Sequence, residues 1–339
     1  MLGRMFNRRR VALARMELAD VNVLVAGGAG MIGSHLVDAL LPRVGRVTVV
    51  DNFVTGQAVN LAHLAQEPRL TIVDADVSEP LPPSVTAAPF DRVYHLASPA
   101  SPVDFLRRPV EIMLVNSAGT RHLLEIARRD GARFLLASTS EVYGDPQHHP
   151  QEETYWGRVN PIGPRSCYDE GKRFAESLTM TYHRMYSLDV RIARIFNTYG
   201  PRARLDDGRI IPNFCVQALT GAPLTIYGDG TQSRSLCYVA DLVSGLIALM
   251  ETDGCPGEVV NLGNPDERTV LEVAEEIIQA TNSRSSIVHR PLPIDEPFRR
   301  QPDISKAYRL LGWQPSIDLD TGLARTLEYF RAVLVNSLS

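Results

Sequence analysis

The chain has 339 residues, of which 44% are hydrophobic and 22% charged, and its net charge is −4. These values are typical of a soluble globular protein with one large or two modest domains. They exclude a global attraction to nucleic acid or to an anionic membrane, so any anion must be held by a local site.

The first 15 residues are basic, with five arginines and no acid. A transit peptide can have this composition, but a flexible tail over residues 1–19 is the favoured interpretation. No stretch approaches the roughly 20 apolar residues of a membrane span, and no apolar signal for secretion is present. We therefore expect a cytoplasmic protein with neither membrane nor nucleic-acid partners.

Short apolar runs then alternate with helical patterns. Near-continuous apolar runs predict strands that are covered on both faces, at residues 21–26, 46–51, 70–74, 92–96, 134–138 and 190–195. Helical patterns between them include residues 31–41 and 110–129. This alternation predicts an α/β fold, a Rossmann-type doubly wound parallel sheet over residues 20–196.

The pattern changes after Asn197. Helices are predicted near 210–219, 238–250, 270–280 and 304–311, joined by loops rich in glycine and proline. We interpret residues 197–332 as a smaller, mixed α/β substrate-binding cap, with some segments returning to the Rossmann domain. Such a cap would close over the carboxyl ends of the strands, where open α/β sheets bind ligands.

Four cysteines occur, Cys167, Cys215, Cys237 and Cys255. None forms a CxxC pair, and no histidine lies near one at zinc-ligand spacing. We therefore expect free thiols in a reducing compartment, with neither a disulfide framework nor a metal site.

A glycine-rich turn directly follows the first predicted strand, with Gly27, Gly30 and Gly33 in a GxxGxxG spacing. Glycines permit a tight turn and close backbone approach, and the helix that follows can present free N–H groups to a pyrophosphate. Asp51 ends the next strand, where an acid can accept hydrogen bonds from an adenosine ribose and would repel a 2′-phosphate. The turn and the acid together favour NAD over NADP, while Asp76 and Val77, after the third strand, could meet the adenine.

Tyr168 and Lys172 form a YxxxK pair, which places both side chains on one face of a helix. An ammonium beside the ring should lower the pKa of Tyr168 and produce a general base for hydride transfer. Thr139, after the fifth strand, can donate a hydrogen bond to the same substrate oxygen.

Longer strings extend these motifs. They are ASPASP at 97–102, STSEVYGDP at 138–146, NPIGPRSCYDEGKR at 160–173, RIFNTYGPR at 194–202 and NLGNP at 261–265. With the glycine turn and the HLAS of residues 95–98, they resemble the extended short-chain dehydrogenases/reductases. Within that family they resemble the UDP-glucuronate decarboxylases, or UDP-xylose synthases, over roughly residues 20–332.

One position separates the relatives. The related 4,6-dehydratases carry an Asp-Glu pair, whose Asp expels water from C6, where this chain has Ser140 and Glu141. The decarboxylases carry Ser-Glu there. A second matching position is Arg300, which the resemblance assigns to the sugar carboxylate, although the neighbouring Arg299 could serve instead. Gln301 replaces the usual Lys, and Met31 a more common Phe.

The resemblance and the motifs together give the predicted site. The expected catalytic residues are Tyr168, Lys172, Thr139, Glu141 and Arg300. The expected NAD-binding residues are Gly27, Gly30, Met31, Ile32, Gly33, Asp51, Asn52, Asp76, Val77, Leu96 and Ala97, with Tyr168 and Lys172. The expected UDP-sugar contacts are Ser140, Asn197, Tyr227, Arg234 and Arg300, with residues 224–227 near the uracil.

The implied reaction is decarboxylation of UDP-glucuronate to UDP-xylose through a 4-keto intermediate, with NADH recycled internally. The alternatives are a nucleotide-sugar 4-epimerase or 4,6-dehydratase, which share the first oxidation, and a non-catalytic NAD-binding regulatory or scaffold protein. The resemblance also implies a homodimer, formed through the helices at 110–129 and 168–186.

Overall fold

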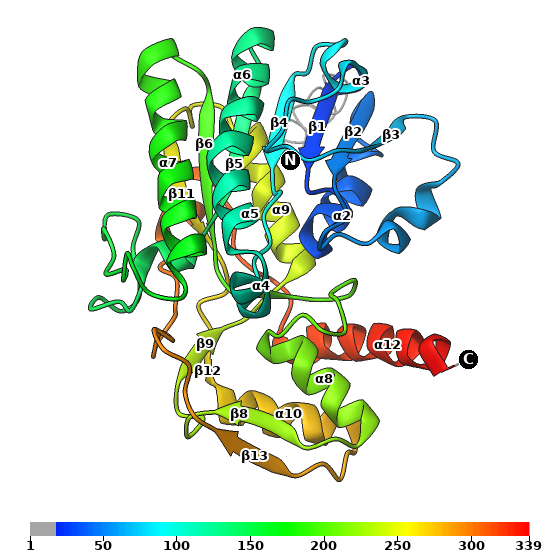
Figure 1. The fold of residues 1–339 in the computed structure, drawn as a ribbon, viewed down its shortest axis with the longest axis vertical. Helices are drawn as coiled ribbons and strands as arrows, with labels where there is room; N and C mark the ends of the chain where they lie inside the picture. The colour runs from blue at the N-terminus through cyan, green and yellow to red at the C-terminus, as the bar shows by residue number, and fades with distance from the viewer. Residues whose placement is uncertain (1–17, 339) are drawn as a thin grey trace, which may run out of the picture.

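A computed structural model of the protein describes residues 18–338, so most of the predicted basic tail lies outside the described residues. Its centre is a seven-stranded sheet in the order β11-β6-β5-β4-β1-β2-β3, and every neighbouring pair is parallel (Figure 1). The strands are β1 (Asn22–Ala26), β2 (Arg46–Asp51), β3 (Leu70–Asp74), β4 (Arg92–His95), β5 (Arg133–Thr139), β6 (Val190–Ile195) and β11 (Glu258–Leu262). This confirms the predicted Rossmann-type sheet.

The two faces of the sheet bury alternate residues of the same strands. In β1, Val23 and Val25 belong to one hydrophobic cluster, and Leu24 and Ala26 belong to another. A strand covered on both faces has no polar face, which explains its continuous apolar sequence.

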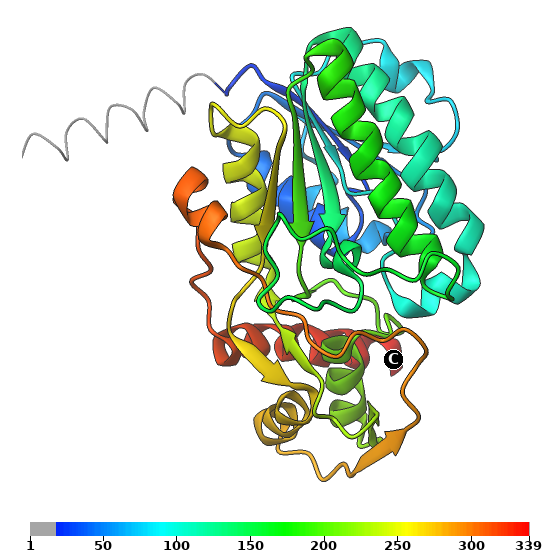
Figure 2. The same cartoon turned by 90° about the vertical axis from the view of Figure 1, so that its left-hand side faces the viewer.

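Helices cover both faces of the sheet. The first cluster includes residues of α2 (Met31–Leu40) and α9 (Val239–Glu251), and the second includes residues of α6 (Thr120–Asp130) and α7 (Ser166–Tyr186). Figure 2 shows α7 beside α6 on one flank of the sheet. Shorter helices are α3 (Pro83–Thr86) and α4 (Pro102–Arg107), and 3₁₀ turns lie at Ala58–Leu64 and Ser140–Tyr143.

The predicted helical segment 110–129 is confirmed, but it contains a π-helical turn in its middle. The segment consists of α5 (Pro109–Leu114), a π-helical turn (Val115–Gly119) and α6. A π turn inserts an extra residue into the helix, and such turns are frequent at functional sites. Here Asn116 lies in the turn, fully buried, and its Nδ2 donates to the Ser98 hydroxyl at 3.0 Å.

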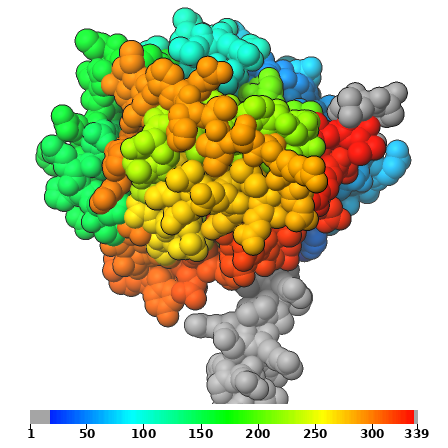
Figure 3. Space-filling model, turned by 90° about the horizontal axis from the view of Figure 1, so that it is seen from below, coloured from blue at the N-terminus to red at the C-terminus, as the bar shows by residue number. Residues whose placement is uncertain are grey.

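The remaining elements form a smaller layer below the carboxyl ends of the strands (Figures 1 and 3). Its helices are α8 (Ile210–Thr220), α10 (Val270–Thr281) and α12 (Leu319–Leu338), whereas α11 (Ser305–Leu311) packs against β11 and α9 (Val239–Glu251) beside the sheet. Its short strands pair as β8 (Leu224–Tyr227) with β13 (Ile287–Arg290), β9 (Ser233–Ser235) with β12 (Glu267–Thr269), and β7 (Thr198–Tyr199) with β10 (Cys237–Tyr238). No helix between residues 18 and 338 is long and apolar enough to cross a membrane.

The layers share one hydrophobic core. The cluster that contains Val23 and Val25 of the sheet also contains Leu224 of β8 and Val273 of α10. Three elements that follow residue 197, α9, β11 and α11, belong to the sheet region rather than to the cap. The predicted domain boundary at residues 196 and 197 therefore stays a prediction.

Candidate active site

A cavity of about 610 Å³ lies between the carboxyl ends of the sheet strands and the cap. Its wall combines the glycine turn, the ends of β5 and β6, the first turns of α7, and residues of the cap. Open parallel sheets bind ligands at this place because strand ends, loops and helix N-termini converge there.

The glycine turn fits a dinucleotide pyrophosphate. Gly27 has φ +81°, and a Cβ on it would stand 2.6 Å from the Ala97 nitrogen, so a side chain has no room there. The N-cap residue of α2 is Gly30, which has no side chain with which to cap the helix, and Gly30, Met31 and Ile32 line the cavity. The first turn of α2 thus presents backbone N–H groups and the positive end of a helix dipole to the cavity.

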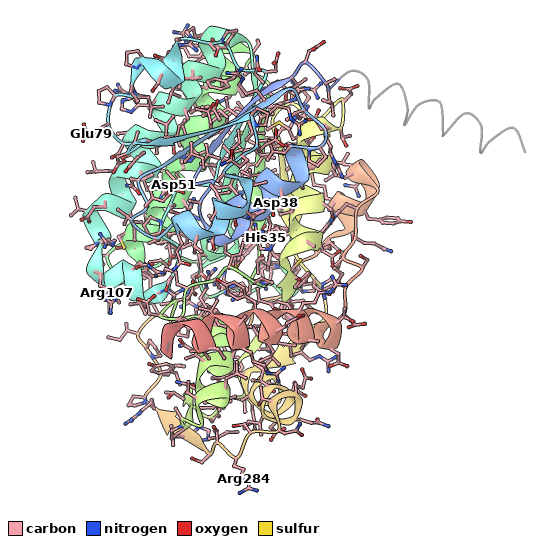
Figure 4. The ribbon with its side chains drawn as sticks, turned by 90° about the vertical axis from the view of Figure 1, so that its right-hand side faces the viewer. His35, Asp38, Asp51, Glu79, Arg107 and Arg284 are labelled. Atoms are coloured by element: carbon pink, nitrogen blue, oxygen red, sulfur yellow. The ribbon has the colours of Figure 1, made fainter. Side chains whose placement is uncertain are left out.

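Asp51 holds this turn in place. It ends β2 beside α2, as Figure 4 shows. Its Oδ2 accepts a hydrogen bond from the Ala29 amide and its Oδ1 one from the Phe53 amide, at 2.8 and 2.9 Å. Each carboxylate oxygen keeps a further lone pair with which it could accept a ribose hydroxyl.

Several predicted cofactor contacts do not line the cavity. They are Asp51, Asn52, Asp76, Val77 and Ala97. Asn52 donates to Asp76 at 2.9 Å, and Val77 is buried in the hydrophobic core. Their contacts with an adenosine stay predictions.

Tyr168 and Lys172 meet at the cavity, one helical turn apart on α7. The Tyr168 ring stacks on Phe105, with 4.7 Å between ring centroids, and its hydroxyl hydrogen-bonds the Thr139 side chain. The Lys172 ammonium donates to the Ala137 carbonyl at 2.9 Å and lies 5.9 Å from the Tyr168 ring centroid. The predicted pair and Thr139 are therefore brought together.

The predicted lowering of the Tyr168 pKa is wrong for the protein as it stands. Burial raises the pKa of Tyr168 above its ordinary value. Burial also lowers the pKa of Lys172 to about 7, so a full positive charge is not fixed beside the ring at neutral pH. Desolvation disfavours the charged form of both groups and is the largest cause of each pKa shift.

Glu141 lies at the centre of a chain of ion pairs. Its Oε2 accepts from Arg165 at 2.9 Å and from Arg300 at 3.0 Å. Arg165 also pairs with Glu296 at 2.9 Å, and Glu296 in turn accepts a hydrogen bond from Arg234. Burial alone would raise the pKa of Glu141, but the guanidinium groups of Arg300 and Arg165 outweigh it and lower that pKa.

The structure distinguishes Arg300 from Arg299. Arg300 is 1% exposed and also donates to the Ser140 carbonyl, whereas Arg299 is exposed. Arg300 does not line the cavity, because it lies behind Glu141. Any influence of Arg300 on a bound sugar would therefore pass through Glu141 in this arrangement.

The predicted sugar-nucleotide contacts Ser140, Asn197, Tyr227 and Arg234 all line the cavity. Four further arginines line it that the sequence analysis did not single out, namely Arg165, Arg202, Arg204 and Arg209. All four pair with acids: Arg165 with Glu141 and Glu296 as described above, and Arg202 with Asp38, Arg204 with Asp104 and Arg209 with Asp207 at 2.6 to 2.8 Å. A loop arginine usually indicates a solvated surface. The available signal for Arg165 and Arg202 was their place within the GPR and YGPR strings, and Arg204 and Arg209 lie outside these strings.

No group of three or more histidine, cysteine or acidic side chains able to hold a metal occurs in the described part of the chain. The site therefore combines a glycine turn that can bind a dinucleotide pyrophosphate, a buried tyrosine–lysine pair, and the Glu141 carboxylate paired with two arginines. Further arginines in its wall are suited to a diphosphate.

Comparison with known proteins yields consistent matches. A family model described as GDP-mannose 4,6 dehydratase matches residues 24–326. UDP-glucuronic acid decarboxylase 1 of Arabidopsis thaliana is 52% identical over 96% of this chain and 73% of its own length. UDP-glucuronic acid decarboxylase 1 of Danio rerio is 51% identical over 91% of this chain and 72% of its own.

One of the similar solved structures was determined with ligands bound. It is the UDP-glucuronic acid 4-epimerase of Bacillus cereus in complex with UDP-glucuronic acid and NAD. It superposes with a TM-score of 0.84 at 30% sequence identity, covering 92% of this chain and 100% of the epimerase.

Proposed function

This chain belongs to the GDP-mannose 4,6-dehydratase family of extended short-chain dehydrogenases/reductases, and from this premise we propose that it decarboxylates UDP-glucuronate to UDP-xylose, with NAD as cofactor. One observation carries the choice of reaction. The β5 strand ends at Thr139, and Ser140 and Glu141 begin the 3₁₀ turn that follows. Glu141 is held as a carboxylate by Arg165 and Arg300 beside Tyr168.

The residues at the glycine turn and α7 would hold NAD, which when bound takes a hydride from C4′ of the sugar and later returns it. Tyr168 would accept the C4′ hydroxyl proton, and Thr139, already hydrogen-bonded to Tyr168, would donate to the same oxygen. A proton on Lys172 stabilises the Tyr168 phenolate that this step needs.

Decarboxylation follows from the position of the new ketone. The 4-keto sugar is a β-keto acid, so CO2 can leave C5 while its electron pair enters an enolate. Protonated Tyr168 and Thr139 would stabilise that oxyanion by hydrogen bonding. Glu141 would face the departing carboxylate, and like charge at close range disfavours the bound acid more than the neutral CO2.

Ser140 argues against dehydration. Loss of water from C6 needs an acid near that carbon, and a serine hydroxyl is a poor proton donor.

Five arginine side chains would share the binding of the diphosphate and the carboxylate. They are Arg165, Arg202, Arg204, Arg209 and Arg234.

A homodimer is part of the proposal. α5 packs against α7, and the two helices expose large apolar side chains, Val110, Met113 and Leu114 from α5 and Phe174 from α7. Exposed apolar side chains on adjacent helices indicate a face that associates with another protein surface.

A cytoplasmic location is also part of the proposal. It is supported by four cysteines that are all free and buried.

The test is to incubate the purified protein with UDP-glucuronate and NAD⁺ and to follow the products by mass spectrometry and chromatography. We expect loss of CO2 and a UDP-pentose that co-elutes with UDP-xylose. A product of unchanged mass that co-elutes with UDP-galacturonate would replace this proposal with a 4-epimerase. A product lacking water would replace it with a dehydratase.

A further inference from the structure

Decarboxylation consumes a proton. A carboxylate leaves C5 as CO2, and the carbanion left at C5, delocalised as an enolate, must receive H⁺ to become the pentose. The proton that Tyr168 removes from the C4′ hydroxyl is returned there when the ketone is reduced, so it cannot supply C5. Each turnover of the proposed function therefore needs one proton from solvent, and the site needs a route for it.

A second cavity, of about 280 Å³, lies beside the active-site cavity. Glu296 belongs to the walls of both cavities. The other polar side chains of the second wall include Asp145, Arg158, Asp169 and Asp295. A polar cavity of this size is large enough for several water molecules.

Asp169 is the buried member of this wall. It follows Tyr168 on the first turn of α7 and is 6% exposed. Its Oδ1 has no hydrogen-bond partner among the described residues, and neither has the buried Nε of Arg165, one turn earlier. A buried, unpartnered carboxyl oxygen costs free energy, so such groups usually have a function or a water partner.

The charges around Asp169 favour its protonated form. Burial raises its pKa, and the negative charge of Glu141 raises it further, while Arg165 and Arg300 oppose the shift. Glu170 on the same helix raises it as well, and Asp145, Arg158, Asp295 and Glu296 face it across the second cavity. The pKa values of these two carboxyl groups are thus shifted in opposite directions: the shift keeps Glu141 ionised and favours the protonated form of Asp169.

We propose that Asp169 is the proton relay of this enzyme, storing a proton from the second cavity and passing it through Glu141 to C5. The inference rests on the proposed function. Two acids with pKa values shifted in opposite directions are the arrangement by which enzymes divide acid and base roles. Glu141, held without a proton by two arginines, cannot be the store; Asp169 can.

The step is balanced in atoms and electrons. The Asp169 O–H bond breaks and its proton forms an O–H bond on the carboxylate of Glu141. That O–H bond breaks in turn as the enolate electron pair forms the C5–H bond, which restores the Glu141 carboxylate. Asp169 is left as a carboxylate and regains H⁺ from solvent through the second cavity. No oxidant or reductant is involved.

The deciding experiment compares two rates in wild type and Asp169→Asn during a single turnover with UDP-glucuronate and NAD⁺. Absorbance of enzyme-bound NADH reports the first oxidation, and quenched samples report UDP-xylose. We expect the variant to form NADH at the wild-type rate but UDP-xylose at least about a hundredfold more slowly, which is the lower end for a lost acid–base group. Glu275→Gln, which removes an exposed carboxylate of α10 that lines neither cavity, is the matched control and should leave both rates unchanged.

Equal rates in wild type and Asp169→Asn would overturn the relay, and so would a parallel loss of both rates, since that indicates a structural role. If Asp169→Asn does not fold, Val159→Phe, which fills the second cavity, must show the same split between the two rates. Infrared difference spectra give a readout independent of turnover: the wild type should carry at neutral pH a protonated-carboxyl band that Asp169→Asn lacks. A wild type that releases no CO2 from UDP-glucuronate would instead refute the proposed function, and the relay with it.

Discussion

At the scale of single residues, burial decides the chemistry of the tyrosine–lysine pair. Tyr168 is 5% and Lys172 3% exposed. Water is replaced around them by Phe105, the Ala137 carbonyl and the α7 backbone, so both groups favour their neutral forms. The proton exchanged with the C4′ hydroxyl would therefore stay within a small set of buried groups.

Removal of the Tyr168 hydroxyl tests its proposed role. Tyr168→Phe keeps the ring stacked on Phe105 but removes the proton acceptor. We expect turnover to fall by roughly a hundredfold or more, with NAD binding retained. Kinetics with UDP-glucuronate and a fluorescence titration with NADH measure the two effects. Wild-type turnover in this variant would contradict the mechanism.

The buried lysine should also leave a signature in the stability of the protein. Its pKa falls from 10.5 to about 7 on folding, so between these pH values the unfolded chain binds more protons. The contribution of Lys172 to stability is therefore fully present above about pH 10.5 and is lost as pH falls toward 7, with a slope of at most ~1.4 kcal/mol per pH unit.

The comparison that isolates this contribution is Lys172→Met. The free energy of unfolding of wild type, minus that of the variant, should rise with pH across this range, because other groups cancel in the difference. Urea unfolding of both proteins at several pH values gives the measurement. Parallel pH profiles would show that Lys172 titrates normally in the folded state.

At the scale of elements, the turn before α2 depends on two glycines for different reasons. A Cβ on Gly33 would overlap the Gly27 carbonyl and stand 2.8 Å from the Gly28 Cα, so the backbone itself excludes a side chain. A Cβ on Gly30 would meet only the Gly27 oxygen, at 3.4 Å, and would point toward the cavity that Gly30 lines.

Substitution at these positions should separate folding from cofactor binding. Gly33→Ala should lower both the melting temperature and NAD affinity, because the turn must move. Gly30→Val should weaken NAD binding at least about tenfold, roughly 1.4 kcal/mol, with little change in melting temperature. Calorimetric titration with NAD⁺ and thermal unfolding measure these effects. If Gly30→Val binds NAD normally, the pyrophosphate does not lie at the N-terminus of α2.

Another element, the π turn between α5 and α6, cannot be predicted from the helical periodicity of the sequence. Residues 110–129 carry a helical pattern throughout, yet the extra residue of the π turn lies at Val115–Gly119. Asn116 thereby reaches Ser98 in the loop after β4, and a Cβ on Gly171 of α7 would stand 3.4 Å from Asn116. Close packing between the two helices fixes this turn, and the local sequence does not reveal it.

At the scale of the whole molecule, ion pairs join segments that are far apart in the chain. Glu141 after β5 pairs with Arg300, and Glu296 in the loop after β13 pairs with Arg165 before α7. These pairs connect the sheet and the cap across the active site. Breaking a buried pair leaves an unpaired charge, so the network constrains how the two layers sit together.

The exposed helical face predicts association of the whole protein. The double variant Met113→Glu, Phe174→Glu would place charges on the apolar face of α5 and α7. We expect the proposed dimer to dissociate in this variant. Sedimentation velocity measures the change. Val59→Glu, at a position 70% exposed in the 3₁₀ turn Ala58–Leu64, is the control and should remain a dimer. A wild type that sediments as a monomer would refute the proposed dimer.

The sequence by itself determined the sheet and the identity of the central pair. The strands β2 and β6 were readable because burial leaves near-continuous apolar runs, and their bounds agree with the prediction. The bounds of β3 agree as well, but the expectation that both its faces are covered is wrong, because β3 is the edge strand and its residues are exposed or half-buried. The glycine turn and the Tyr168–Lys172 spacing were readable because they are local patterns of conformation. The roles of individual site residues and the domain boundary stay predictions.

Only the tertiary structure decided the partners and charge states. It added β11 to the sheet edge, selected Arg300 rather than Arg299 for Glu141, and set the opposite pKa shifts of Glu141 and Asp169. It also showed that burial raises the pKa of Tyr168. Each of these depends on contacts between distant residues and on the removal of water, and neither can be read from neighbours along the chain.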